Sequence, residues 1–175
     1  GFFLVSNSGN SSILIYKNIK KHGYKLELLK SIKCTKSLFY VHKSIFIKND
    51  SFVLSISRDC STLVEFEILK NNIGDSSIFL NKNWELIGEN NGLKYPSSLA
   101  YDPKQKIIVV ANREELGLTF FSLQDKPILE FSLNESFFES FGIASPHDVN
   151  FSADHKFLIV THKNRKRNKL EMNSG

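Results

Sequence analysis

Apolar residues along this chain occur in short runs that polar turns interrupt. The runs are rich in Val, Ile, Leu and Phe, and none shows the 3.6-residue periodicity of an amphipathic helix. This pattern is typical of β-strands joined by tight turns. Four segments share the form of one β-rich run, a polar turn and a second β-rich run: FFLVSNSGNSSILIYKN from Phe2, SFVLSISRDCSTLVEFEIL from Ser51, KIIVVANREELGLTFFSLQ from Lys106 and KFLIVTHKNRKRNKLEM from Lys156.

Two longer stretches align with each other over their whole length. YPSSLAYDPKQKIIVVAN runs from Tyr95 to Asn112, and SPHDVNFSADHKFLIVTH runs from Ser145 to His162. Each contains a short alternating strand, a polar turn and a second apolar strand, which together predict a β-hairpin. A hairpin repeated at a period of about 50 residues is typical of the blades of a β-propeller. The repeat reaches the N-terminus through the equivalent positions Val5, Leu54, Val110 and Val160.

A four-stranded antiparallel blade, with strands a to d from the propeller axis outward, fits the whole chain. The first blade lacks strand a, and the last has strands a and b and a truncated strand c that ends near Met172. In the second blade, Asn71 to Asn83 is predicted to be an insertion before a last strand at Trp84 to Gly88. A connection from Asn134 to Ile143 joins the third blade to the fourth. The predicted blades cover residues 1–33, 38–90, 95–134 and 145–175.

About three and a half blades cannot close a ring, because known propellers have four to eight. The sequence therefore predicts an all-β fold: a single partial domain over residues 1–175 that belongs to a ring of six or seven blades. We expect the remaining blades to come from missing sequence. An unclosed array of this kind exposes two sheet faces that are built for neighbouring blades.

The net charge of the chain does not add a nucleic-acid-binding function to the predicted propeller. The formal net charge is +5, but it is concentrated in one predicted loop that contains Lys163, Arg165, Lys166, Arg167 and Lys169. A single basic loop is not a nucleic-acid-binding face. We expect it to be solvated, with an anion contact as the alternative. No apolar run approaches the about 18 residues of a membrane helix, so the sequence predicts neither a nucleic-acid partner nor a membrane span.

Antiparallel topology predicts which loops share one end of a blade. The connection that enters strand a and the loop that leaves strand b lie at the same end, near the axis. We call this end the rim. Propellers commonly bind ligands at such a place. The polar residues predicted at the rim are Asn7, His42, Arg58, Asp59, Ser97, Ser98, Asn112, Arg113, Glu114, Glu115, His147, Asp148, His162 and Lys163.

The two aligned hairpins resemble the P-H-x-V-x-F-S-P-D-G-K-x-L-x-V hairpin of the YVTN/lactonase-like β-propellers. That group includes 6-phosphogluconolactonase-type seven-bladed enzymes and many binding or surface propellers. Asp102 and Asp154 resemble the turn Asp of the motif, while its following Gly is replaced by Lys104-Gln105 in one copy and His155 in the other. The resemblance implies a propeller fold and, as one functional alternative, hydrolysis of a phosphorylated sugar lactone.

The adjacent pair His147 and Asp148 is a candidate site. His147 is a candidate general base or ligand contact, because imidazole titrates near neutral pH. The alternative is that His147 caps the strand-entry turn and Asp148 hydrogen-bonds to loop amides. His162 stands where Asn7 and Asn112 stand in their repeats, so we expect it to brace its loop. A metal site from the two histidines and Asp148 is a further alternative that the spacing does not require, and we predict no metal and no cofactor.

Arg113 and Glu114 follow strand b of the third blade. An arginine there is suited to a phosphate or carboxylate, with the acid positioning water; the alternative is a solvated, charged turn. The chain contains no nucleophile elbow, phosphate loop or zinc-finger spacing.

Cys34 and Cys60 are predicted on the same rim, where a disulfide and two reduced thiols are both consistent with the sequence. The cellular compartment is left open.

These observations favour a binding module over an enzyme, because a strong scaffold signal stands beside no recognisable catalytic set. We predict that the rim receives a protein or small-molecule ligand, with Asp148, Asn112, His162, Ser97 and His42 as contact residues. The second hypothesis is a lactonase-like hydrolase. Its candidate catalytic residues are His147, Arg113 and Glu114. The third is a purely architectural repeat of a larger protein.

Overall fold

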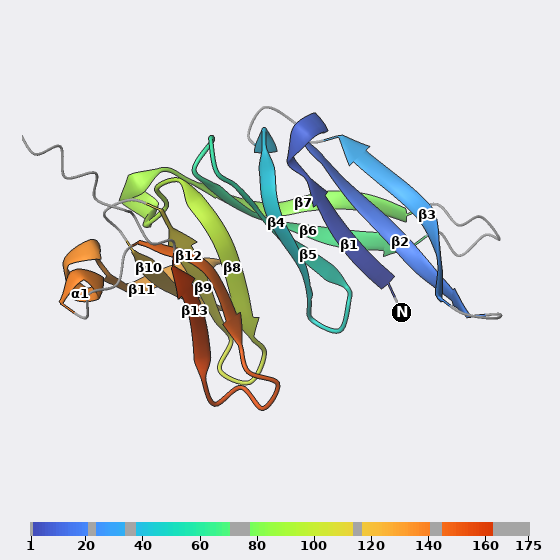
Figure 1. Cartoon of the computed structure of the whole chain (residues 1–175). Coiled ribbons are helices and arrows are strands. Elements are labelled where there is room, and N and C mark those ends of the chain that lie inside the picture. Colours follow the sequence, from blue (N-terminus) through green and yellow to red (C-terminus); the bar gives the residue numbers. More distant parts are fainter. Residues whose placement is uncertain are drawn as a thin grey trace, which may run out of the picture.

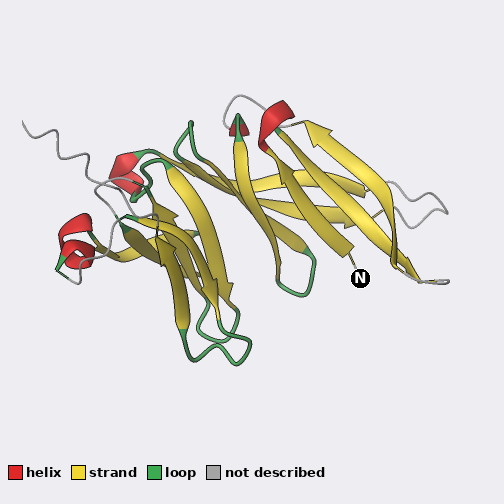
Figure 2. Ribbon diagram, in the orientation of Figure 1, coloured by secondary structure: helices red, strands yellow, loops and turns green. Residues whose placement is uncertain are grey.

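The computed structural model describes residues 2–20, 24–33, 38–70, 78–113, 117–140 and 145–162. Their strands form four antiparallel sheets with very little helix, which confirms the all-β prediction (Figure 2). The strands are β1 (Phe2–Asn7), β2 (Ser12–Lys20), β3 (Tyr24–Lys33), β4 (Val41–Ile47), β5 (Phe52–Ser57), β6 (Thr62–Lys70), β7 (Ile78–Ile87), β8 (Pro96–Asp102), β9 (Ile107–Asn112), β10 (Leu118–Leu123), β11 (Pro127–Leu133), β12 (Pro146–Phe151) and β13 (Leu158–His162).

Each sheet is a meander in which consecutive strands pair. The orders are β1-β2-β3, β4-β5-β6-β7, β8-β9-β10-β11 and β12-β13. Successive sheets lie side by side, with β4 beside β1, β8 beside β4 and β12 beside β8, and the four do not close into a ring (Figure 1). We call β4, β8 and β12 the inner strands, because they correspond to the predicted strands a.

Two parts of the predicted layout are wrong. The predicted insertion from Asn71 to Asn83 overlaps β7, which already begins at Ile78. The connection after the third sheet contains a short helix, α1 (Glu135–Glu139), that the absence of helical periodicity did not predict. Asn134 caps this helix, because its side-chain oxygen accepts a hydrogen bond from the Phe137 backbone at 3.2 Å. A capped helix of this length is too short to produce a periodic pattern.

The main core lies between the second and third sheets. Its side chains come from the faces of the two sheets that meet, and Trp84, Phe121 and several aliphatic residues fill it. A second core joins the third sheet to the fourth and includes Phe138 of α1. A third joins the first sheet to the second. Since each sheet buries apolar residues against its neighbour, the array is held together sheet by sheet, as in other repeat folds.

Apolar side chains remain exposed at the two ends of the array. Phe3 and Val5 of β1 are 45% and 44% exposed, and Phe157 and Ile159 beside and within β13 are 67% and 54% exposed. The four side chains lie on the first and last sheets, which have a neighbouring sheet on one side within the described residues. The exposed faces expected of an unclosed array are therefore present.

The two turn aspartates of the aligned hairpins do not occupy equivalent positions. Asp102 pairs with Ile107, and the corresponding residue of the fourth sheet is Ser152, whose amide donates to the Phe157 carbonyl at 2.9 Å. Asp154 lies two residues further along its turn, where its carboxylate accepts from the Ser152 hydroxyl at 2.7 Å. Each turn therefore uses its own arrangement of side-chain acceptors.

Candidate functional site

The three inner strands begin with the same irregularity in their pairing. The register with strands β5, β9 and β13 shifts between Val41 and Lys43, between Pro96 and Ser98, and between Pro146 and Asp148. One residue in each strand is therefore left without a cross-strand partner in the register: His42 in β4, Ser97 in β8 and His147 in β12. Such β-bulges re-aim side chains and are common beside functional sites. All three bulged residues lie at the rim, as the sequence predicted from topology.

The bulged residues form a hydrogen-bonded ladder from one sheet to the next. Burial lowers the pKa of His42, and a hydrogen bond between its ring and the backbone of Ser97 opposes this lowering, as expected when the ring nitrogen is the donor. The Ser97 hydroxyl in turn donates to the backbone carbonyl of His147 at 2.7 Å. Each step links one side chain to the main chain of the equivalent residue in the following sheet. Ser97 therefore acts as a brace between sheets.

A second contact row lies one residue further along the inner strands. The Lys43 ammonium is 2.9 Å from both the Ser98 hydroxyl and a carboxylate oxygen of Asp148. It also donates to the Val149 carbonyl and the Asn150 side-chain oxygen, each at 3.1 Å. Ser98 also donates to the Asp148 carboxylate. One lysine thus connects three sheets around four oxygen atoms.

Lys43 was not among the predicted site residues. Lys43, Ser98 and Asp148 are the third residues of three equivalent strands, so a lysine and an aspartate at aligned positions were the available signal. The structure places the Asp148 carboxylate in this row, where its hydrogen bonds go to Lys43, Ser98, Asn150 and the Val149 amide. These contacts resemble the predicted structural alternative, in which Asp148 binds backbone amides.

The Asp148 carboxyl has a lowered pKa. Burial alone would raise this pKa, but hydrogen bonds from Ser98 and Lys43, together with the positive charge of Lys43, outweigh burial. The folded state therefore favours the ionised carboxylate more than the unfolded chain does. The resulting stabilisation is present above the unfolded pKa of about 4 and is lost as the pH falls through the lower folded-state pKa.

Asp148→Asn is accordingly expected to reduce the loss of stability on acidification. The measurement is the urea midpoint of the wild type and the variant between neutral pH and the acid limit of folding. Asp125→Asn is the matched control, because no hydrogen bond or ion pair engages Asp125 within the described residues. Parallel pH profiles for the wild type and Asp148→Asn would contradict the assignment.

Two arginines lie near the bulged histidines. Arg58 follows β5, Arg113 follows β9, and both strands end at the rim. The pKa of His42 is lowered by burial first and then by the positive charges of Arg58, His147 and Arg113. These side chains therefore lie close enough for their charges to act on one another. Arg58 and Arg113 bring positive charge to the rim from two sheets, which favours an anion there.

Of the remaining predicted site residues, the structure describes Asn112 and His162 but not Glu114. Asn112 is fully buried, and its amide donates to the Thr119 hydroxyl at 2.9 Å while its oxygen accepts from the Lys94 backbone at 2.8 Å. Asn112 therefore braces a loop, and we do not include it in the proposed site. His162 pairs with Pro146 and is exposed. Outside the described residues lie Glu114, Glu115, Cys34 and the basic segment Lys163 to Lys169.

Neither a metal cluster nor a long apolar helix occurs in the described ranges. No three His, Cys, Asp or Glu side chains of these residues lie close enough to hold a metal ion, so His147, Asp148 and His162 do not form a metal site. No helix among the described residues has the length and hydropathy needed to cross a membrane. Cys34 lies outside these residues, so a disulfide with Cys60 and two reduced thiols both stay consistent with the sequence.

Comparisons with known proteins identify the fold and leave the activity open. No family model and no curated protein matches the chain. A Bacteroides fragilis protein assigned as a 6-phosphogluconolactonase has a similar structure, with a TM-score of 0.66 at 12% sequence identity. A Lactobacillus plantarum protein gives 0.65 at 11%, and the β-propeller domain of Myceliophteria thermophila Cps50 (Swd1) gives 0.57 at 12%.

The chain has a β-propeller fold and is similar in structure to both the WD40 and the lactonase-like propellers. The likeness covers 93% of this chain in the two bacterial structures and 92% in the Myceliophteria domain, but 47% of each of those chains. The chain thus spans about half the length of these propellers. At such low identity the likeness defines the fold and carries no residue roles.

Proposed function

We propose that this chain is the scaffold of a binding module that receives an anionic group of its ligand at the rim. The observation that carries the proposal is the gathering of Arg58 and Arg113, together with the rings of His42 and His147, at one end of three adjacent sheets. A guanidinium group presents a planar fork of donors that matches a carboxylate or a phosphate.

One of the two arginines at the rim is paired with a carboxylate. The Arg58 guanidinium is 3.2 Å from Asp59, but no carboxylate among the described residues forms an ion pair with Arg113. The Asp148 carboxylate is already compensated by Lys43 at 2.9 Å. Arg113 is therefore the group on which we expect anion binding to depend most strongly.

The proposal is tested with 6-phosphogluconate, a probe that carries both a phosphate and a carboxylate. Isothermal titration is expected to show binding to the wild type and a loss of at least about tenfold in affinity for Arg113→Gln, since a charged hydrogen bond contributes about 1.5–3 kcal/mol. Lys156→Gln is the matched control, because it removes one positive charge from the opposite end of the fourth sheet. Equal losses in both variants, or no binding to the wild type, would refute the proposed anion site.

The lactonase hypothesis remains the second candidate. It is supported by the hairpin resemblance and by the position of His147 at the rim, near His42, on which both arginines also act. If it holds, the protein accelerates hydrolysis of 6-phosphogluconolactone above the spontaneous rate, and His147→Ala loses most of that acceleration. If a folded protein binds 6-phosphogluconate but the lactone is hydrolysed only at the spontaneous rate, the lactonase hypothesis is excluded and the binding module is favoured. An architectural repeat predicts neither binding nor turnover.

A further inference from the structure

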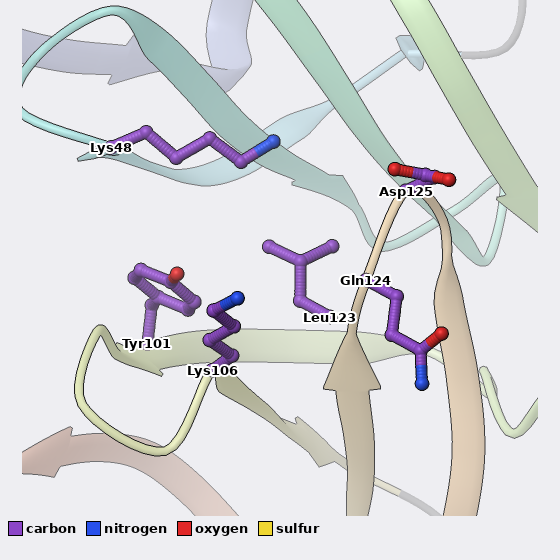
Figure 3. A pocket seen from close by; sticks show the side chains of 6 residues that line it. All are labelled: Lys48, Tyr101, Lys106, Leu123, Gln124 and Asp125. Carbon is purple, nitrogen blue, oxygen red and sulfur yellow. The ribbon is translucent and has the colours of Figure 1, made fainter.

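A pocket of about 490 Å³ lies at the end of the sheets opposite the rim. Its lining comes from the turns of the second and third sheets: Lys48, Tyr101, Lys106, Leu123, Gln124 and Asp125 (Figure 3). Lys48 follows β4, Lys106 precedes β9 and Leu123 ends β10, whereas the rim lies at the other ends of these strands. The volume falls within the range of about 300–1,000 Å³ that is typical of small-molecule sites.

Two contacts hold the walls of this pocket in place. The Leu123 amide donates to the Lys106 carbonyl at 2.7 Å, which fixes two turns of the third sheet against each other. On the opposite wall, the Lys48 ammonium is 3.0 Å from the fully buried Glu65 carboxylate and 4.2 Å from the centre of the Phe52 ring. The charge of Lys48 is therefore already compensated from within the second sheet.

The other charged and polar groups of the lining are unused. Within the described residues, no hydrogen bond or ion pair engages the side chains of Tyr101, Lys106 or Asp125. Figure 3 shows Tyr101 and Lys106 next to each other on one side of the pocket and Asp125 on the other, with the apolar side chain of Leu123 between them. The pocket thus offers an ammonium and a hydroxyl at one end and a carboxylate at the other.

We propose that this pocket binds a small zwitterion whose ammonium and carboxylate are separated by an aliphatic chain, as in an ω-amino acid, independently of the rim. The carboxylate of the ligand is held by Lys106 and Tyr101, its ammonium by Asp125, and its aliphatic part lies against Leu123. A purely anionic ligand fits less well, because Glu65 neutralises Lys48 and Asp125 would repel a second negative charge. The positive charge of Lys106 would repel a purely cationic ligand.

Three matched probes test this assignment: 6-aminohexanoate, hexylamine, which lacks the carboxylate, and hexanoate, which lacks the ammonium. In titrations followed by NMR of the backbone amides, 6-aminohexanoate is expected to cause saturable shifts around Lys106 and Asp125. Each incomplete probe is expected to bind about tenfold more weakly, since it leaves one charged group of the pocket unpaired. Absence of saturable shifts with 6-aminohexanoate, or equal affinities for the three probes, would overturn the proposal.

Single substitutions assign each end of the ligand to its protein group. Lys106→Gln is expected to abolish the preference for 6-aminohexanoate over hexylamine, and Asp125→Asn the preference over hexanoate. Arg113→Gln alters the rim and is expected to leave all three affinities unchanged. Because the pocket and the rim lie at opposite ends of the strands, failure of one proposal is distinguishable from failure of the other. Unchanged preferences in both pocket variants would overturn the assignment.

Discussion

Replacing Gly117 with alanine is expected to destabilise the protein by about 2–4 kcal/mol, which combines backbone strain with a steric collision. Gly117 has φ +57°, a left-handed conformation that L-residues adopt at a cost. A Cβ atom there would collide with the Leu133 carbonyl oxygen and lie 2.9 Å from a ring atom of Phe138. Since Leu133 pairs with Leu118 at the start of β10, the collision would separate β10 from β11. Urea unfolding of the variant and the wild type measures the difference.

Gly9→Ala is the matched control for this substitution. Gly9 lies in the turn between β1 and β2, which is equivalent to the turn that Gly117 closes, and the nearest atom to its Cβ would be a side-chain oxygen of Asn7 at 3.5 Å. We expect this variant to remain near wild-type stability. If Gly117→Ala and Gly9→Ala unfold at the same urea concentration, the steric argument is wrong.

Lys48→Met is expected to cost about 2–3 kcal/mol of unfolding free energy, because it leaves a buried carboxylate without its cation. Glu65 is fully buried, and the Lys48 ammonium is 3.2 Å from one of its carboxylate oxygens and 3.0 Å from the other. After the substitution, the Asn83 amide, at 2.6 Å, would be the remaining side-chain donor to Glu65 among the described residues. Chemical unfolding at neutral pH measures the loss.

A double-mutant cycle separates this charge effect from lost packing. Glu65→Gln keeps the shape of the side chain but removes its charge, so Lys48→Met is expected to cost much less in the Glu65→Gln background. The difference between the two backgrounds is the coupling energy of the pair. If Lys48→Met costs the same in both, the loss comes from the contact of Lys48 with Phe52 and the ion pair contributes nothing measurable.

Most strands were predictable because a sheet buried on one or both faces leaves a visible pattern of apolar residues. Strand β5 is one example, since five of the six residues in its burial pattern are buried and its sequence is nearly continuous in apolar residues. Strand β7 is the exception. Its residues Asn81, Lys82 and Asn83 are polar because an outer strand packs on fewer neighbours, and the sequence signal began at Trp84.

The candidate site was predictable to the extent that topology determines it. Antiparallel pairing identifies the loops that share one end, so His42, Arg113 and His147 were expected together. Pairing does not determine where a side chain points, and Asn112 turns into the core where a ligand contact was expected. Lys43 was missed because its contacts cross two sheet boundaries, which no local pattern records.

The ladder of bulged residues has a consequence for how freely the sheets can diverge in sequence. The two donors are chemically different, a histidine ring and a serine hydroxyl, yet each binds the main chain of the next sheet. A backbone acceptor is supplied by any amino acid at that position, so a substitution in one repeat leaves the contact that it receives from the preceding repeat intact. Neighbouring repeats therefore need not co-evolve at this contact, and each can exchange its donor independently.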